Sequence, residues 1–239
     1  MLLLPDLVQK PPSGLLISVR RAGPDRRFRL GFLSWFSNEG TGPLVVAGSR
    51  PSRVDPTMRA DQLVIRDDGS VLRRRGIGSM RYVRAETHEH WHLLPFDRYE
   101  LWPVGAPRRP IEARKSGFCL SDQLLDRAVS PRARPEKPVF TRECGRRSPG
   151  LLSVRHGLSV GWLDYYLPTL EGQSFDVTTL PSGDYVLVNT LNAEGLLRES
   201  DRTNDSASVR LHLSWPHGHR AKPRVRVVRV CPHSRRCPR

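Results

Sequence analysis

Apolar and polar residues alternate along several short segments of the chain, and apolar residues at helical spacing hardly occur. Phe28, Leu30 and Phe32 alternate with arginine or glycine, and the same alternation recurs at 209–215. Successive side chains of a strand point to opposite faces, so this pattern predicts strands with one buried and one solvated face. Valines among arginines at 225–230 predict a last strand at a sheet edge, where the charges discourage pairing with another chain.

Turn-forming residues separate these predicted strands at short intervals. The residues Asp-Asp-Gly-Ser at 67–70 lie between two apolar runs and predict a hairpin. Farther along, strands are expected at 175–178 and 185–188, because the residues between them include Pro, Ser, Gly and Asp, which favour turns. Another turn is expected at 192–195. Short strands with such regular punctuation are typical of a β-sandwich.

Length and composition agree with one β domain. The chain has 239 residues, 38% of them hydrophobic, with 21 prolines and 19 glycines, which supplies both a core and many turns. The stretch 121–150 has no period and is rich in proline and arginine, so a long surface loop is expected there. No repeat or linker is visible. We therefore predict a mainly β fold, a single β-sandwich domain over 1–239 with long loops, little helix and an Arg-rich edge strand and tail at its C-terminal end.

The formal net charge of +15 at pH 7 raises the question of a polyanionic partner. The basic residues are mostly arginine, are spread along the whole chain, and form small clusters without interleaved aromatic residues. An Arg-rich solvated surface explains this distribution better than a nucleic-acid-binding face, so no nucleic-acid partner is expected. The sequence contains no apolar run of about 20 residues, so no membrane span is predicted. The apolar start at 1–4 is too short for the apolar region of a signal peptide.

Four cysteines, Cys119, Cys144, Cys231 and Cys237, include no CxxC pair, which excludes a zinc ribbon. An even number permits two disulfides, most simply Cys119–Cys144 and Cys231–Cys237, in an oxidising compartment. Four unrelated buried thiols are the alternative, and spacing does not decide between the two.

The most informative segment of the chain is His-Glu-His-Trp-His at 88–92. Residues i, i+2 and i+4 of a strand share one face, so His88, His90 and His92 are expected to line up on one side. Neutral imidazole suits Cu, Zn, Fe and Ni, and three such ligands leave open positions, as in a catalytic metal site. The alternative is an exposed His-rich strand that meets metal only by accident. The remaining histidines are isolated or lie in a loop, and no special role is expected for them.

Several segments together resemble the lysyl oxidase family. The run 87–101, with its HxHxH sequence and the aromatic strand after it, is similar to the copper-binding segment of that family. The similar segments follow in order along nearly the whole chain, at 4–8, 87–101, 114–122, 157–166, 172–178 and 197–205. The low cysteine count is more similar to bacterial members than to the cysteine-rich animal ones.

The resemblance implies a copper-dependent amine oxidase with a quinone made from its own side chains. His88, His90 and His92 would bind Cu²⁺, and Lys115 and Tyr166 would be joined by copper-dependent autooxidation into lysyl tyrosylquinone. The quinone is needed because no unmodified side chain takes two electrons from an amine. The substrate amine would form a Schiff base with it, and a general base would remove a proton from the α-carbon. O₂ would reoxidise the cofactor, with release of hydrogen peroxide and ammonia.

Ordinary structural roles are the alternative for these residues. Lys115 considered alone would be a solvated surface lysine, and Tyr166 could pack in the core with its hydroxyl bonded. Tyr165 is one position out of register and is the less favoured quinone precursor. The general base should be a carboxylate near the quinone. Asp164 is the candidate because it shares a strand face with Tyr166.

A calcium site is implied by an acidic turn late in the chain. Its oxygen ligands would suit a hard cation such as Ca²⁺ and would be joined, as in the family, by an Asp-Leu pair near the start of the domain. The candidate ligands are Glu199, Asp201, Asn204, Asp205, Asp6 and the backbone carbonyl of Leu7. The alternative is an acidic turn that caps itself with Asx-type hydrogen bonds. A bound ion would clamp the N-terminal segment to this turn.

Two functions of different classes follow from these patterns. The first is a secreted amine oxidase that uses O₂ to deaminate primary amines or peptidyl lysine in a protein or peptide substrate. The second is a noncatalytic β-sandwich that binds copper or a polyanion at the cell surface. The histidine segment together with Lys115 and Tyr166 favours the enzyme, because a binding protein has no need of all of them. The arginine content and the lack of a visible export signal favour the binding protein.

Overall fold

The computed structural model describes residues 1–22, 25–85, 88–105, 109–113, 117–130, 133–141 and 143–238, without the side chains of Ala22, Asp25 and His88. The regular elements in this part of the chain are β-strands, and it contains no α-helix. The prediction of a mainly β fold is therefore confirmed. No helix with the length and hydrophobicity needed to cross a membrane occurs among the described residues.

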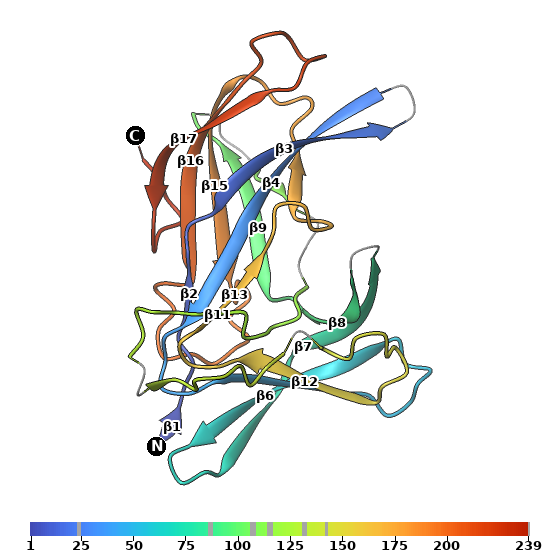
Figure 1. Ribbon diagram of the computed structural model, residues 1–239, viewed down its shortest axis with the longest axis vertical. Coiled ribbons are helices and arrows are strands. Elements are labelled where there is room, and N and C mark those ends of the chain that lie inside the picture. The colour runs from blue at the N-terminus through green and yellow to red at the C-terminus, as the bar shows by residue number, and fades with distance from the viewer. Residues whose placement is uncertain are drawn as a thin grey trace.

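The described strands form three antiparallel sheets (Figure 1). The first contains β1 (Leu2–Leu3), β5 (Leu44–Ser49), β6 (Thr57–Arg66), β7 (Val71–Ala85), β8 (His88–Leu94) and β12 (Ser153–Leu158). The second contains β9 (Asp97–Pro103), β10 (Ile111–Glu112), β15 (Gly183–Leu191), β16 (Ser206–Ser214) and β17 (Arg224–Cys231). The third contains β2 (Leu7–Gln9), β3 (Ser13–Ala22), β4 (Asp25–Asn38), β11 (Leu124–Leu125), β13 (Trp162–Tyr166) and β14 (Ser174–Asp176).

The second and third sheets pack face to face, and the first crosses one end of them. Figure 1 shows β9, β15, β16 and β17 beside β3 and β4, with β6, β7, β8 and β12 running across below. Phe32 of β4 meets Tyr99 of β9 edge-on, with ring centroids 4.8 Å apart. Phe118 contacts Tyr99 at 5.9 Å and Tyr166 of β13 at 4.7 Å, and one hydrophobic core draws on all three sheets. The loop that carries Phe118 is therefore packed where the three sheets meet.

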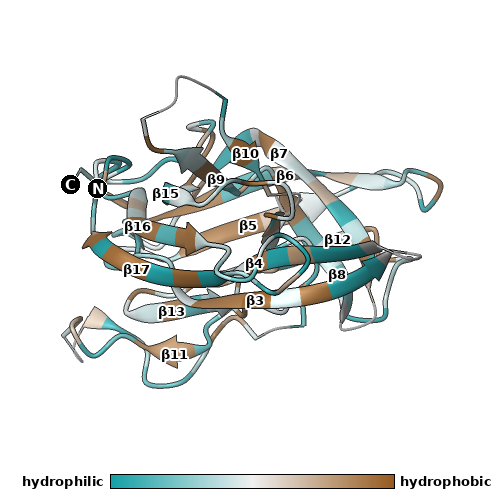
Figure 2. Cartoon of the chain, turned by 90° about the horizontal axis from the view of Figure 1, so that it is seen from above, coloured by the Kyte–Doolittle hydropathy of each residue, from teal (hydrophilic) through white to brown (hydrophobic). Residues whose placement is uncertain are grey.

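Most of the predicted strands and turns are present, and the alternation behind them is visible in Figure 2 as bands of both colours along β3, β4 and β17. The hairpin at 67–70 joins β6 to β7, and β17 is the edge strand of its sheet. The long segment 121–150 contains only β11 as regular structure in its described part. Both predicted disulfides, Cys119–Cys144 and Cys231–Cys237, are formed.

Two local predictions are wrong. The strand expected at 175–178 ends at Asp176, because Asp176 Oδ1 accepts both the backbone N–H and the hydroxyl of Thr178 and closes a turn.

The second wrong prediction is the solvated face of the strand at 209–215, which corresponds to β16. Arg210 on that face is buried, since its guanidinium donates to Asp184 Oδ2 at 2.7 Å from Nη2. A long charged side chain can lie flat against its sheet when a neighbouring strand supplies the counterion.

Candidate functional site

The histidine segment forms β8, which pairs along one edge with β7 as an antiparallel strand. His92 is buried and His90 is half-buried, whereas the side chain of His88 lies outside the described residues. The Nε2 atoms of His90 and His92 are 2.9 Å apart, so both rings aim at one point from the same strand face. The predicted alignment on one face holds for these two histidines.

This separation fits a shared metal ion. Two nitrogens bound at about 2.0–2.1 Å to one ion lie roughly 2.9 Å apart when they subtend a right angle there, a common angle in tetragonal Cu(II) sites. The same distance also fits a hydrogen bond between one protonated and one unprotonated nitrogen. Among the described side chains, no group of three or more His, Cys, Asp or Glu residues is close enough to hold a metal. A third ligand from β8 would be His88.

The second edge of β8 is covered by two loop segments. The backbone N–H of Trp91 donates to Cys144 O at 2.9 Å. Leu93 and Phe118 exchange two backbone N–H···O bonds, of 2.9 and 3.1 Å. The Cys119–Cys144 disulfide joins these two loop segments to each other. As a result, the segment that follows Lys115 lies directly against the histidine strand. Lys115 itself lies outside the described residues.

Tyr166 and Asp164 share a face of β13 and form a buried pair. The Tyr166 hydroxyl lies 2.9 Å from Asp164 Oδ2 and 2.7 Å from Cys119 O, and it donates to these acceptors. Asp164 is fully buried and also accepts the Ser121 N–H at 3.2 Å. Gln123 Nε2 donates to its other oxygen. Donors on both oxygens stabilise a charged carboxylate in a buried position.

His156 was not singled out by the sequence analysis, yet it lies beside this site. It is on β12, is 1% exposed, and its Nδ1 accepts the Leu120 N–H at 3.2 Å. Burial, together with the nearby charge of His90, lowers its pKa to about 3. One local signal could have found it, since Val154, His156 and Leu158 alternate on one face of a predictable strand. Its neighbours, however, come from distant parts of the chain.

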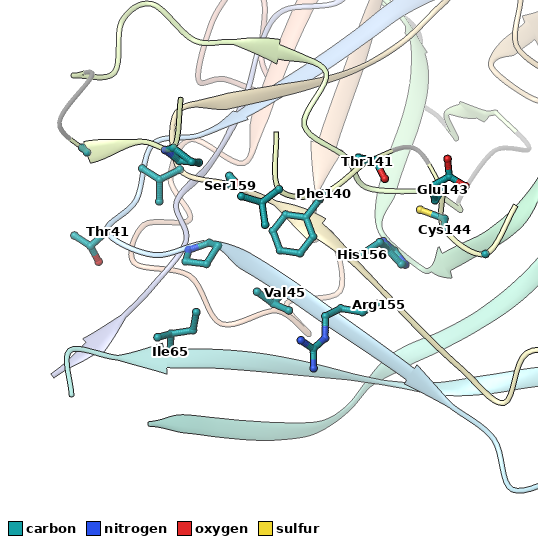
Figure 3. Close-up of a pocket in the computed structure, with 16 residues that line it drawn as sticks. Thr41, Val45, Ile65, Phe140, Thr141, Glu143, Cys144, Arg155, His156 and Ser159 are labelled. Carbon is teal, nitrogen blue, oxygen red and sulfur yellow. The ribbon is translucent and has the colours of Figure 1, made fainter. Parts of the chain in front are cut away.

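A cavity of about 680 Å³ lies between β5, β12 and the loop segments 133–141 and 143–145 (Figure 3). Its walls include Val45, Phe140 and Arg155, and His156 and Cys144 lie side by side at one end. Tyr166 does not line it. The cavity therefore approaches the site from the side of His156 and the disulfide, not from the side of the tyrosine hydroxyl.

The proposed calcium ligands lie in one region, where late residues meet the N-terminal segment. Leu7 N–H donates to Glu199 Oε2 at 3.0 Å, and Asn204 Nδ2 donates to Asp6 Oδ1 at 2.9 Å. Asp201 is partly exposed and caps Thr203 at 2.8 Å, as the self-capping alternative expects. Within the described part of the chain, no three acidic side chains lie close enough together to hold a metal ion.

Two observations favour a cation here nonetheless. Burial raises the pKa of Glu199 to about 8, with the charge of Asp205 adding to the effect. Burial likewise raises the pKa of Asp205 to about 7 against the opposing influence of Arg202, while Asp6 and Asp201 raise it further. Asn204 Oδ1 and Asp205 Oδ1 are buried without a hydrogen-bond partner in the described part of the chain. Crowded carboxylates and unsatisfied oxygens are features that a hard cation would relieve.

The fold and the site together define an all-strand protein in which a histidine pair, a disulfide-linked loop and a buried tyrosine–aspartate pair meet. The lysyl oxidase family model matches residues 65–219, which is more than half of the chain. The chain therefore belongs to the lysyl oxidase family.

Individual relatives share little more than a quarter of their residues with this chain over the matched regions. Protein-lysine 6-oxidase of Rattus norvegicus is 27% identical over 133 residues, which are 55% of this chain and 28% of that protein. The Homo sapiens protein of the same name is 28% identical over the same shares. Lysyl oxidase homolog 2B of Danio rerio is 27% identical over 157 residues, or 65% of this chain and 18% of that protein. The match thus spans less than a third of each of these relatives.

Proposed function

We propose that this chain is a copper-dependent amine oxidase that converts primary amines or peptidyl lysine into aldehydes. One observation carries the proposal. The segment after Lys115 pairs with the histidine strand through Phe118 and Leu93 and, one residue later, accepts the Tyr166 hydroxyl at Cys119 O. Three segments that are far apart in the sequence are thereby packed together as one site. A binding protein would need only the histidines.

The histidines would hold the metal, and the disulfide would hold their strand. His90 and His92, with His88, are the proposed ligands of Cu²⁺, and the 2.9 Å between Nε2 atoms suits nitrogens that share one ion. Bound copper, and the quinone formed from Lys115 and Tyr166, would supply the two-electron chemistry that side chains lack. The backbone hydrogen bonds from β8 to Cys144 and Phe118 would hold the histidine strand in a fixed position relative to Tyr166.

Asp164 would act on protons. Its Oδ2 accepts the Tyr166 hydroxyl proton at 2.9 Å, so it can orient the ring and receive that proton. The same carboxylate is our candidate for the base that removes the α-proton of the substrate amine. Phe118 closes over Tyr166 edge-on at 4.7 Å and limits the access of water.

The overall reaction balances as amine, O₂ and water giving aldehyde, ammonia and hydrogen peroxide. The relatives are named for protein-bound lysine, which supports a peptidyl lysine or a similar primary amine as substrate. Two disulfides with no free cysteine in the chain support an oxidising, secreted location. We further propose that Ca²⁺ binds near Asp6, Glu199, Asn204 and Asp205 and ties the N-terminal segment to the late acidic turn.

The decisive experiment is to load the purified chain with copper under air and follow visible absorption and phenylhydrazine labelling. Peptide mapping should recover one adduct that crosslinks the peptides of Lys115 and Tyr166, and Lys115→Ala should lack it. Copper binding with no quinone in the unaltered chain would refute the oxidase.

A polyanion-binding surface is the second candidate, because arginines alternate along the exposed edge strand β17. Arg224 and Arg226 are exposed there, in a chain with a net charge of +15. Retention on a heparin column should then fall in the Arg224→Ala, Arg226→Ala double variant. If the unaltered chain elutes at low salt, the surface has no such role.

A further inference from the structure

His156 is buried on β12 and is outside the set of proposed copper ligands. It is 1% exposed, and its Nδ1 accepts the Leu120 N–H at 3.2 Å. A backbone N–H can only donate, so Nδ1 must be the unprotonated nitrogen of the ring. The neutral ring then carries its proton on Nε2.

This tautomer decides what the ring can do. An Nε2 that keeps its proton donates a hydrogen bond, whereas a nitrogen must give up its proton to bind a metal. The Nε2 of His156 is buried and has no hydrogen-bond partner within the described residues. Buried donors without an acceptor are rare because they lose their hydration without compensation. The Nε2–H of His156 therefore needs an acceptor, and none of the described residues supplies one.

The surroundings of His156 point to the proposed copper site. Its partner Leu120 lies two residues after Phe118, which pairs with Leu93 of the histidine strand. Figure 3 shows the imidazole at one end of the cavity, beside Cys144. The peptide unit that donates to His156 through Leu120 N–H also accepts the Tyr166 hydroxyl at Cys119 O, 2.7 Å away. One peptide group thus joins His156 to the tyrosine.

We propose that His156 is a hydrogen-bond donor of the copper site and not a fourth metal ligand. Its Nε2–H would hold a small anion or oxygen ligand beside His90, while Nδ1 fixes the peptide that positions the Tyr166 hydroxyl. The inference rests on the proposed oxidase function, because it takes copper to be bound at the histidine strand. It assigns to β12 a residue that binds a ligand of the copper through one ring nitrogen and supports the Tyr166 hydroxyl through the other.

The acceptor at Nδ1 and the donor at Nε2 can be removed separately by substitution. In His156→Asn the side chain can still accept near the position of Nδ1, but it loses the donor at the position of Nε2. In His156→Gln the amide nitrogen can take the place of the Nε2 donor, but the acceptor for Leu120 is lost. His217→Asn serves as control, since His217 is exposed in a loop.

Azide is the probe, and its binding to the copper-loaded protein is read from the charge-transfer absorption. We expect the azide affinity of His156→Asn to fall at least tenfold, with that of His156→Gln and His217→Asn within about threefold of the unaltered chain. Copper content and the nitrogen hyperfine pattern in electron paramagnetic resonance should stay unchanged in all three. An unchanged azide affinity in His156→Asn would overturn the proposal, and so would loss of copper or of one nitrogen coupling.

Histidine ¹⁵N NMR gives a readout that is independent of copper. The His156 resonance, assigned by its disappearance in His156→Asn, should show a protonated Nε2 both in metal-free protein and after loading with Zn²⁺. Zn²⁺ should shift the resonances of the proposed ligands His88, His90 and His92 and leave that of His156 in place. Deprotonation of His156 Nε2 by Zn²⁺ would make it a ligand and refute the donor role. Failure of the unaltered chain to bind copper would instead refute the proposed oxidase, while the metal-free spectrum would still decide the protonation state of His156.

Discussion

Tyr166 and Asp164 face each other on the same side of β13, with the tyrosine hydroxyl 2.9 Å from Asp164 Oδ2. Both side chains are buried, and Ser121 N–H donates to the same carboxylate oxygen at 3.2 Å. This contact places a proton acceptor at the hydroxyl of the proposed quinone precursor. It also makes the choice between Tyr166 and its neighbour Tyr165 open to experiment.

Replacing Tyr166 with phenylalanine should abolish the phenylhydrazine-reactive cofactor and leave copper binding intact. The reason is that the hydroxyl is lost while the ring still packs against Phe118. Tyr165→Phe is the matched control, because Tyr165 is the adjacent tyrosine on the opposite strand face. Labelling that survives in Tyr166→Phe and disappears in Tyr165→Phe would reverse the assignment.

Asp164→Asn should lower the rate of amine oxidation by about 10²–10⁴-fold per titrated quinone, the usual contribution of a general acid or base. The asparagine amide is nearly isosteric and can still accept the Ser121 N–H, so the fold should persist. Steady-state peroxide production across pH, normalised to quinone content, measures the effect. Asp176→Asn, a turn carboxylate on β14, should keep the full rate. A normalised rate equal to that of the unaltered chain would show that another group is the base.

His90→Ala should reduce the copper content of the purified chain by at least tenfold, because it removes one of the two imidazoles whose Nε2 atoms are 2.9 Å apart. His217→Ala tests whether loss of any histidine has this effect, since His217 is exposed in a distant loop. Metal content by mass spectrometry, together with competition against a chelator, gives the measurement. Equal copper retention by both variants would place the metal elsewhere.

Calcium should stabilise the protein more at pH 8 than at pH 5.5. The pKa values of Glu199 and Asp205 are raised by burial to about 8 and about 7, so between pH 4 and 8 the folded state binds more protons than the unfolded state. Stability without calcium must therefore fall as pH rises through this range. Calcium binds the deprotonated oxygens and should offset that loss at the upper end.

Thermal unfolding with calcium and with a chelator at both pH values tests this. Each kcal/mol of stabilisation should raise Tm by about 2–4 °C in a chain of this size. Asp205→Asn should remove roughly half of the pH dependence, because Glu199 keeps a pKa that its own burial raises, and it should weaken the calcium effect. A calcium effect that is equal at both pH values, or absent at pH 8, would contradict the proposed site.

Loss of the Cys119–Cys144 disulfide should cost more stability than loss of Cys231–Cys237. The bridges have sequence separations of 25 and 6 residues, and loop-closure entropy gives about 3.5 and about 2 kcal/mol. The corresponding double serine variants should show this order in denaturant unfolding. Only the first should also weaken the quinone signal, because Cys119 O accepts the Tyr166 hydroxyl. The reverse order of stability would show that native contacts outweigh chain entropy.

The local periods of the chain were sufficient to predict much of the fold. Alternation places His90 and His92 on one face of a strand, and the same rule puts Asp164 and Tyr166 together. The turn at 67–70 could be read from its residues, because glycine and aspartate adopt the backbone angles that such a turn requires. These features depend on neighbours within a few residues, which the sequence displays directly.

Other features depend on which segments meet in space. His156 had no special role in the sequence analysis, and the role proposed for it depends on its contact with Leu120, 36 residues away. Arg210 was expected on a wet face, but Asp184 on the adjacent strand allows it to be buried. Strand alternation is a property of the backbone and is therefore fixed locally. The partner of a buried polar atom is chosen by long-range packing, so only the tertiary structure decided which histidine, carboxylate and peptide group share this site.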